Sequence, residues 1–142
     1  MGPQFLFSCK EENISKIEDG IKSVGLKIAR IPPIICDDGS EAYMDLLCDT
    51  NDDFDWLSAS EKKDCLQFRM DFAAHPYIEF SYEHNKQKRE YNGRIYLNGS
   101  SIEDRSIKSK YSAYYKSLKK WFKQNSSSTV RETLTLNVYY LR

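Results

Sequence analysis

The residues with the clearest capacity for chemistry are acidic and lie close together. The stretch from residue 37 to residue 55 contains no lysine or arginine and holds eight carboxylates: Asp37, Asp38, Glu41, Asp45, Asp49, Asp52, Asp53 and Asp55. Carboxylates grouped in this way suit three roles. They can bind a divalent cation, serve a metal-dependent hydrolytic site, or present a negative surface to a cationic partner.

Part of the acidic run begins like a calcium-binding loop, with the pattern D-x-N-x-D-x-D over residues 49–55. Such loops carry glycine at the sixth position and a bidentate glutamate at the twelfth. This chain has Phe54 and Ser60 at those positions. We therefore reject a calcium loop of the EF-hand type. Convergence of the acids on a metal is not visible in a sequence, and a solvated acidic loop without a role is a further interpretation.

An anionic docking surface is the functional interpretation that we favour for the acidic run. Exposed carboxylates steer a cationic partner, and tryptophan is a frequent anchor in protein interfaces. Trp56 follows the run directly, and Trp121 stands beside Phe122 in an expected helix whose apolar face has no room for both. The predicted partner-binding residues are the eight acids together with Trp56 and Trp121.

The second half of the chain has the opposite charge. Residues 1–65 carry 7 Lys and Arg against 14 Asp and Glu, whereas residues 66–142 carry 14 against 7. In the segment 107–124, lysines are interspersed with tyrosine, tryptophan and phenylalanine, a mixture that single-stranded nucleic acid can use. Helical spacing also assigns most of these aromatics to a core face. A nucleic-acid-binding module built on helix 107–124 is therefore our alternative hypothesis.

Signatures of catalysis are sparse. His75 and His84 are the only histidines, and the chain has no G-x-S-x-G motif and no glycine-rich phosphate loop. The four cysteines lack metal-ligand spacing, and we expect them to be free, buried thiols. Enzymatic activity is disfavoured, and a small carboxylate- or metal-dependent hydrolase is the third hypothesis. We predict no catalytic residue, no metal ligand and no cofactor.

The elements that must position these residues follow from hydrophobic periodicity. Apolar residues at helical spacing predict helices over 13–24 and 107–124, and Gly25 is suited to end the first. A capping-box pattern at Ser58 predicts a short helical turn. Alternating or short apolar runs predict strands at 5–7, 26–31, 43–47, 66–72, 78–82, 94–97 and 134–140.

Size and composition complete the expected architecture. The chain has 142 residues, 40% of them hydrophobic and 13% aromatic, which is enough for one core. We predict a single α+β domain over residues 1–142, with a mostly antiparallel sheet of five to seven strands and both main helices packed on one face. No apolar run approaches the roughly 20 residues of a membrane span, and no secretory signal is evident. We expect a cytoplasmic protein.

The size, the charge and the lack of catalytic motifs resemble those of bacterial immunity proteins, which neutralise a cognate toxin by covering its active site. The resemblance is one of type and assigns no individual residue. It implies a non-enzymatic, protein-binding function in which the acidic residues 37–55 mask a basic toxin or nuclease. The implied partner is a basic protein and not a membrane.

Overall fold

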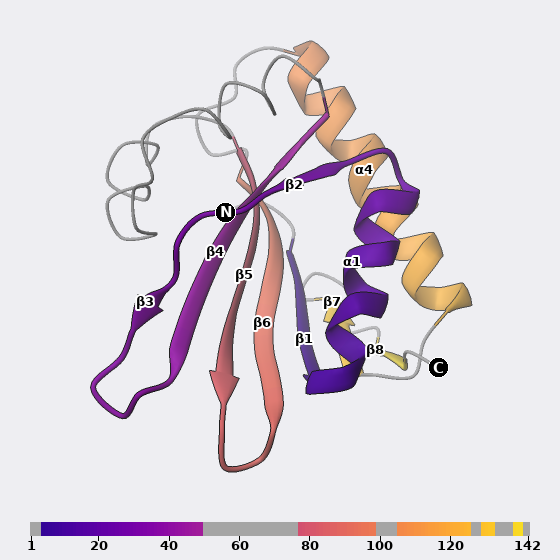
Figure 1. Ribbon diagram of the computed structural model, residues 1–142. Coiled ribbons are helices and arrows are strands. Elements are labelled where there is room, and N and C mark those ends of the chain that lie inside the picture. The colour runs from indigo at the N-terminus through magenta and orange to yellow at the C-terminus, as the bar shows by residue number, and fades with distance from the viewer. Residues whose placement is uncertain (1–3, 50–76, 99–104, 126–128, 133–137, 141–142) are drawn as a thin grey trace.

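The structure is a computed structural model that describes residues 4–49, 77–98, 105–125, 129–132 and 138–140. It has a large antiparallel sheet with two long helices beside it (Figure 1), which confirms the α+β class. The elements run β1 (Gln4–Lys10), the 3₁₀ turn η1 (Glu11–Asn13), α1 (Ile14–Ser23), β2 (Lys27–Ala29), β3 (Ile34–Ile35), β4 (Glu41–Cys48), β5 (Tyr77–Asn85), β6 (Glu90–Asn98), α4 (Arg105–Gln124), β7 (Thr129–Glu132) and β8 (Val138–Tyr140).

β1, the first strand of the described chain, is an interior strand of the sheet. Seven strands follow one another in the order β2-β4-β5-β6-β1-β7-β8, and β3 pairs with β4 as an eighth strand off this path. β1 pairs along its length with β6 on one side and with β7 on the other. The two longest strands, β5 and β6, form a hairpin whose turn lies at the lower end of Figure 1.

The alternation of side chains divides each strand between two faces of the sheet. On β5, Ile78, Phe80 and Tyr82 are buried on the face toward the helices. On β1, Phe5 and Phe7 lie on the same face, whereas Leu6 between them is 37% exposed on the opposite face. The strand predicted at 5–7 is therefore present, with Leu6 as its exposed position.

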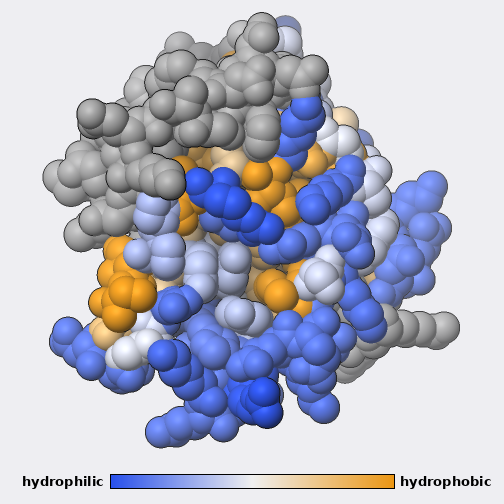
Figure 2. Space-filling model, in the orientation of Figure 1, coloured by the Kyte–Doolittle hydropathy of each residue, from blue (hydrophilic) through white to orange (hydrophobic). Residues whose placement is uncertain are grey.

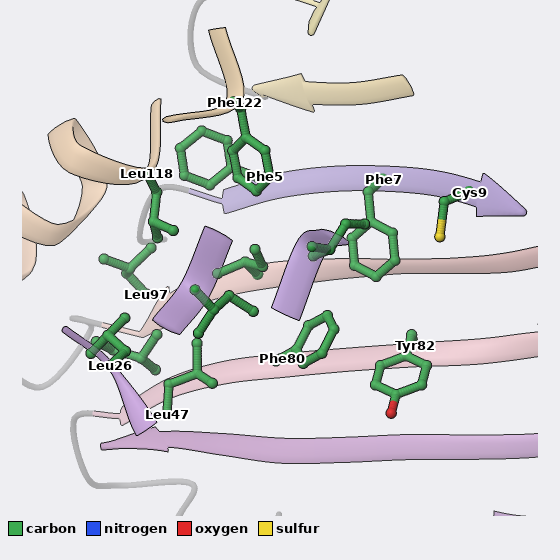
Figure 3. Close-up of a cluster of buried hydrophobic side chains, with 14 residues drawn as sticks. Phe5, Phe7, Cys9, Leu26, Leu47, Phe80, Tyr82, Leu97, Leu118 and Phe122 are labelled. Carbon is green, nitrogen blue, oxygen red and sulfur yellow. The ribbon is translucent and has the colours of Figure 1, made fainter. Parts of the chain in front are cut away.

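The larger of two hydrophobic clusters lies between this face of the sheet and the helices (Figure 3). Ile17 and Ile21 of α1 and Leu118 and Phe122 of α4 are fully buried in it. The ring of Phe5 lies 5.2 Å from that of Phe122. Burying each such side chain stabilises the fold by roughly 1.5–3 kcal/mol. Both helices therefore pack on one face, as their periodicity predicts.

Several boundaries differ from the prediction. Gly25 does end the first helix, with a φ of 93° and an amide that bonds the carbonyl oxygen of Lys22. The helix begins one residue later than predicted, since the turn η1 leads into α1 and Asn13 precedes it without a capping hydrogen bond from its side chain. Of the strand predicted at 134–140, residues 138–140 form β8, which pairs with β7, and residues 134–137 lie outside the described residues. The elements predicted at Ser58 and at 66–72 lie outside the described residues.

Neither helix in the described part of the chain is both long and apolar enough to span a bilayer.

Candidate functional site

The described acids of the run do not form one surface. Of its eight carboxylates, Asp52, Asp53 and Asp55 lie outside the described residues, as does Trp56. The remaining five are spread from the turn after β3 to the end of β4, and they have different environments.

Asp45 is an interior residue. Its side chain is 1% exposed and accepts hydrogen bonds from Nη1 of Arg30 at 2.7 Å and from the amide of Ile31 at 3.2 Å. Burial raises the pKa of this carboxyl, and the hydrogen bond from Arg30 opposes the rise. Arg30 also pairs with Glu18 of α1 at 2.8 Å, so it joins the helix to the sheet. The prediction that Asp45 contacts a partner is therefore wrong, because its carboxylate is enclosed and used within the fold.

Asp49 is also engaged within the chain. Its carboxylate lies 2.9 Å from Nζ of Lys110 on α4. Tyr114, one turn further along the helix, has a raised pKa because of burial and the nearby Asp49. The contact joins the acidic first half of the chain to the basic second half, so part of the charge asymmetry is neutralised within the fold.

The turn between β3 and β4 contains the acids that face solvent. Asp37 and Asp38 are exposed. The Asp38 carboxylate accepts bonds from the amide and the hydroxyl of Ser40, which lower its pKa. Glu41 is half-buried and accepts a hydrogen bond from the Tyr43 hydroxyl. An acidic surface therefore persists at this turn, smaller than the one predicted from the sequence.

Trp121 packs on the other helix. The ring is half-buried and rests on Gly20 of α1, while the neighbouring Phe122 is fully buried. The expectation that only one of the two aromatics could face the core is wrong. Gly20 has no side chain, and it therefore leaves room for the indole. Trp121 is therefore a contact between the two helices, and its part in partner binding stays a prediction.

A groove on the opposite face of the sheet is the most site-like feature of the described chain. Its volume is about 540 Å³. It is lined on one side by Leu6 of β1 and by Ser81, Asn92 and Arg94 of the β5–β6 hairpin. We call this feature the sheet groove. Its other lining residues include Ile34, Cys36, Ala42, Met44 and Glu83.

The wall of the sheet groove is held by a partly buried ion pair. Arg94 donates from Nε and Nη2 to Oε1 of Glu79 at 3.3 and 3.2 Å, and Glu79 is fully buried. The guanidinium also bonds Gln4 at 3.4 Å and lies 4.5 Å from the ring centre of Tyr96. Three neighbours fix the orientation of Arg94, and its charge is matched by that of Glu79. The groove wall is therefore rigid and close to neutral at this point.

The cysteine at the groove and the described histidine do not form a pair. Cys36 lines the groove, whereas His84 follows Tyr82 on the helix side of β5 and pairs with Glu11 at 2.5 Å. The thiol and the imidazole thus lie on opposite faces of the sheet. Within the described residues, no group of three or more His, Cys, Asp or Glu side chains is placed to hold a metal ion.

An acidic rim borders the groove at the hairpin end. Glu83 lines the groove and is exposed, and Asp37 and Asp38 directly follow the lining residue Cys36. We call these three carboxylates the acidic rim. Figure 2 shows an apolar patch over β3 beside the hydrophilic lower end of the molecule, where the β5–β6 hairpin lies in Figure 1. Apolar and charged surface therefore adjoin at this end.

Sequence reasoning missed the groove. Its residues alternate along the strands with core residues, and periodicity shows which side chains share a face but not which face stays open. Leu6 carried a usable signal, because an antiparallel sheet with one solvated face alternates apolar and polar residues. Apolar side chains on both faces of β1 indicate a second surface that contacts something, whereas Met44 on β4 packs in a second hydrophobic cluster within the fold.

Comparisons of the chain with protein families, curated proteins and solved structures found no match.

Proposed function

We propose that this chain is a non-enzymatic protein-binding domain that masks a basic partner, as immunity proteins mask toxins or nucleases. The sheet groove and its acidic rim would form the docking surface. The observation that carries the proposal is the combination, on the sheet face opposite both helices, of an apolar hollow with exposed carboxylates at its edge.

The apolar part of the groove would supply most of the affinity. Leu6 is 37% exposed at the groove, an unusual degree for a leucine in an interior strand of a sheet. Ile34, which is half-buried, also lines the hollow. A groove of about 540 Å³ can accept whole side chains of a partner, and interface energy concentrates where such anchors are fully desolvated.

The acidic rim would supply selectivity and speed. The charge of Arg94 is matched by Glu79, so Asp37, Asp38 and Glu83 set the sign of the charge beside the groove, with Lys86 near Asp38 opposing them in part. Surfaces of one sign accelerate the approach of an oppositely charged protein and exclude partners of like charge. A basic protein with an exposed apolar side chain fits this arrangement.

We place this activity in the cytoplasm. The three described cysteines, Cys9, Cys36 and Cys48, are free thiols, and Cys36 is only partly buried. Free thiols persist in reducing compartments, which supports a cytoplasmic site of action.

Site-specific crosslinking tests the proposal directly. A photoreactive benzoylphenylalanine would replace Leu6 in the groove, and in a second chain it would replace the exposed Lys22 on α1. Illumination in extracts of the native host should give one dominant crosslinked protein at Leu6, basic in composition, that is absent at Lys22. The same proteins at both positions, or products at Lys22 alone, would contradict the groove as the docking surface.

A further inference from the structure

The helix α4 carries a row of positive side chains on its solvent side. It holds seven cationic residues and no acidic residue. With about 100° of rotation per residue, six of the seven fall within an arc of about 120°. These six define the α4 stripe: Arg105, Lys108, Lys116, Lys119, Lys120 and Lys123.

The fold fixes the direction in which the stripe points. Leu118 and Phe122 are fully buried on the opposite side of α4, where they anchor the helix to the sheet. Five of the six stripe residues are exposed, and Lys119 is half-buried. Lys110 is the cation outside the arc, and it pairs with Asp49. The stripe is therefore a preformed row of charge and not a flexible tail.

The dimensions of the stripe suit a long polyanion. The 18 positions between Arg105 and Lys123 span about 27 Å at 1.5 Å per residue. Duplex DNA carries one negative charge per roughly 1.7 Å of its axis, so such a row passes many phosphates. Ser109 and Ser112 are exposed within the same arc. Their short side chains permit close approach, and hydroxyls are common donors to phosphate oxygens.

The aromatic residues of α4 argue against the single-stranded mode suggested by the sequence. Tyr111, Tyr114, Tyr115 and Trp121 are partly buried and pack against the hydrophobic core, so little of their ring faces is open to unpaired bases. The described residues expose large apolar side chains at Leu6 and Ile35 only, and neither is on α4. A membrane-surface helix would need such side chains along one side. Of the three polyanionic partners considered, a single strand, a membrane and a duplex, the exposed side chains of α4 best fit a duplex recognised by its phosphate backbone.

We propose that the α4 stripe binds the phosphate backbone of double-stranded nucleic acid, at a surface separate from the sheet groove. Binding is electrostatic and releases counterions, so the logarithm of the affinity falls linearly with the logarithm of salt concentration, with a slope of about −0.9 per phosphate contacted. Six cations set an upper limit of about −5 for that slope. Little sequence preference is expected, because phosphate contacts carry none directly.

Fluorescence anisotropy with a labelled 20-base-pair DNA duplex of mixed sequence, from about 50 to 200 mM salt, tests the proposal. A matching RNA duplex shows whether both forms are accepted, and binding of either supports the proposal. The substitutions Lys116→Gln, Lys120→Gln and Lys123→Gln together should weaken binding at least tenfold at low salt and flatten the slope by about three. The charge-matched control changes the exposed Lys22, Lys86 and Lys88 to Gln and should leave binding within about twofold.

A second pair of variants tests the stripe without removing any lysine, by adding one negative charge inside or outside the arc. Ser112→Glu adds a negative charge inside the stripe, and Ser117→Glu adds the same charge at an exposed position outside the arc. Both serines are on α4, so helix propensity changes equally. Ser112→Glu should weaken duplex binding several-fold more than Ser117→Glu. Equal effects of the two would overturn the assignment to the stripe.

Three further outcomes would overturn the proposal: no duplex binding at low salt, equal losses in the stripe and control triple variants, or tighter binding of a single strand than of the duplex. Binding of phosphatidylserine vesicles without binding of duplex would assign the stripe to a membrane instead. Duplex binding should survive Leu6→Arg in the groove. This separates a failure of the stripe from a failure of the proposed protein-binding function.

Discussion

Gly20 of α1 and Trp121 of α4 lie face to face at the contact between the two helices. A methyl group added at Gly20 would come within 2.6 Å of Cε3 and Cζ3 of the indole. The missing side chain therefore sets how closely the helices approach. It also explains how two adjacent aromatics of α4 both pack inward.

Replacement of Gly20 by alanine should destabilise the protein. A gain of about 1 kcal/mol in helix propensity is outweighed by overpacking, which costs about 1–3 kcal/mol, and the indole must move. Urea unfolding followed by tryptophan fluorescence measures the change. The exposed Lys22→Ala on the same helix is the control and should lie within about 0.5 kcal/mol of the parent. A Gly20→Ala protein more stable than the parent would show that the contact is loose.

Much of the fold follows from the sequence, because it rests on local periodicity. The alternation on β5 and the 3.6-residue period of α4 identify their buried faces directly. Alternation along β4 also puts Asp45 on the core side of the strand, together with Tyr43 and Leu47. The acidic composition of the segment obscured this signal. The partner of Asp45, Arg30, was beyond reach, since a pair 15 residues apart depends on tertiary packing.

The candidate site was harder to predict. Which strands lie beside each other decides where the groove forms, and β1 enters the sheet between β6 and β7, far from its neighbours in sequence. Leu6 on β1 and Arg94 on β6 are partners only through this long-range register. The role of Gly20 was equally hidden, because no local rule tells that a glycine inside a helix faces an indole.

The Arg30–Asp45 pair should make stability depend on pH in a defined way. Removal of the guanidinium by Arg30→Gln leaves a buried carboxylate without its counterion, which costs about 2–3 kcal/mol at neutral pH. Burial already raises the pKa of Asp45, and the substitution raises it further. The folded state therefore binds the proton more readily than the unfolded chain. The destabilisation caused by the substitution decreases as the pH falls through the raised pKa.

Urea unfolding at several pH values tests this pair. The difference in unfolding free energy between Arg30→Gln and the parent should be largest at pH 7 and should shrink as Asp45 becomes protonated. Glu18→Gln, which removes the more exposed contact of Arg30 on α1, is the control, with an expected cost below about 1 kcal/mol. A difference that is constant with pH would mean that the carboxylate is not the cause.

Thiol reactivity should distinguish the groove from the core. Burial raises the pKa of Cys9 to about 12, and Cys48 is also buried, whereas Cys36 is partly exposed at the groove. In a chain carrying Cys65→Ser, iodoacetamide at pH 8 should therefore label Cys36 first, as peptide mass spectrometry would show. Prior addition of the partner protein that the crosslinking experiment identifies should slow this labelling. Faster labelling of Cys9 than of Cys36 would contradict the described burial.

The acidic rim should govern association more than dissociation. Asp37→Lys and Glu83→Lys together reverse two exposed charges beside the groove. The rate of association with the basic partner should fall at least fivefold in low salt and approach the parent rate in high salt, because rim charges steer encounter. Stopped-flow kinetics at two salt concentrations measure this. An unchanged association rate would remove the rim from the docking surface.

The most direct measurement is the affinity of the purified partner for two charge-matched variants by calorimetry. Leu6→Arg places a charge in the groove, whereas Ile35→Arg places the same charge at a position that is 63% exposed and does not line it. The proposed function predicts a loss of at least a hundredfold for Leu6→Arg and less than threefold for Ile35→Arg. Equal affinities for the two variants, with both folded, would contradict binding through the sheet groove.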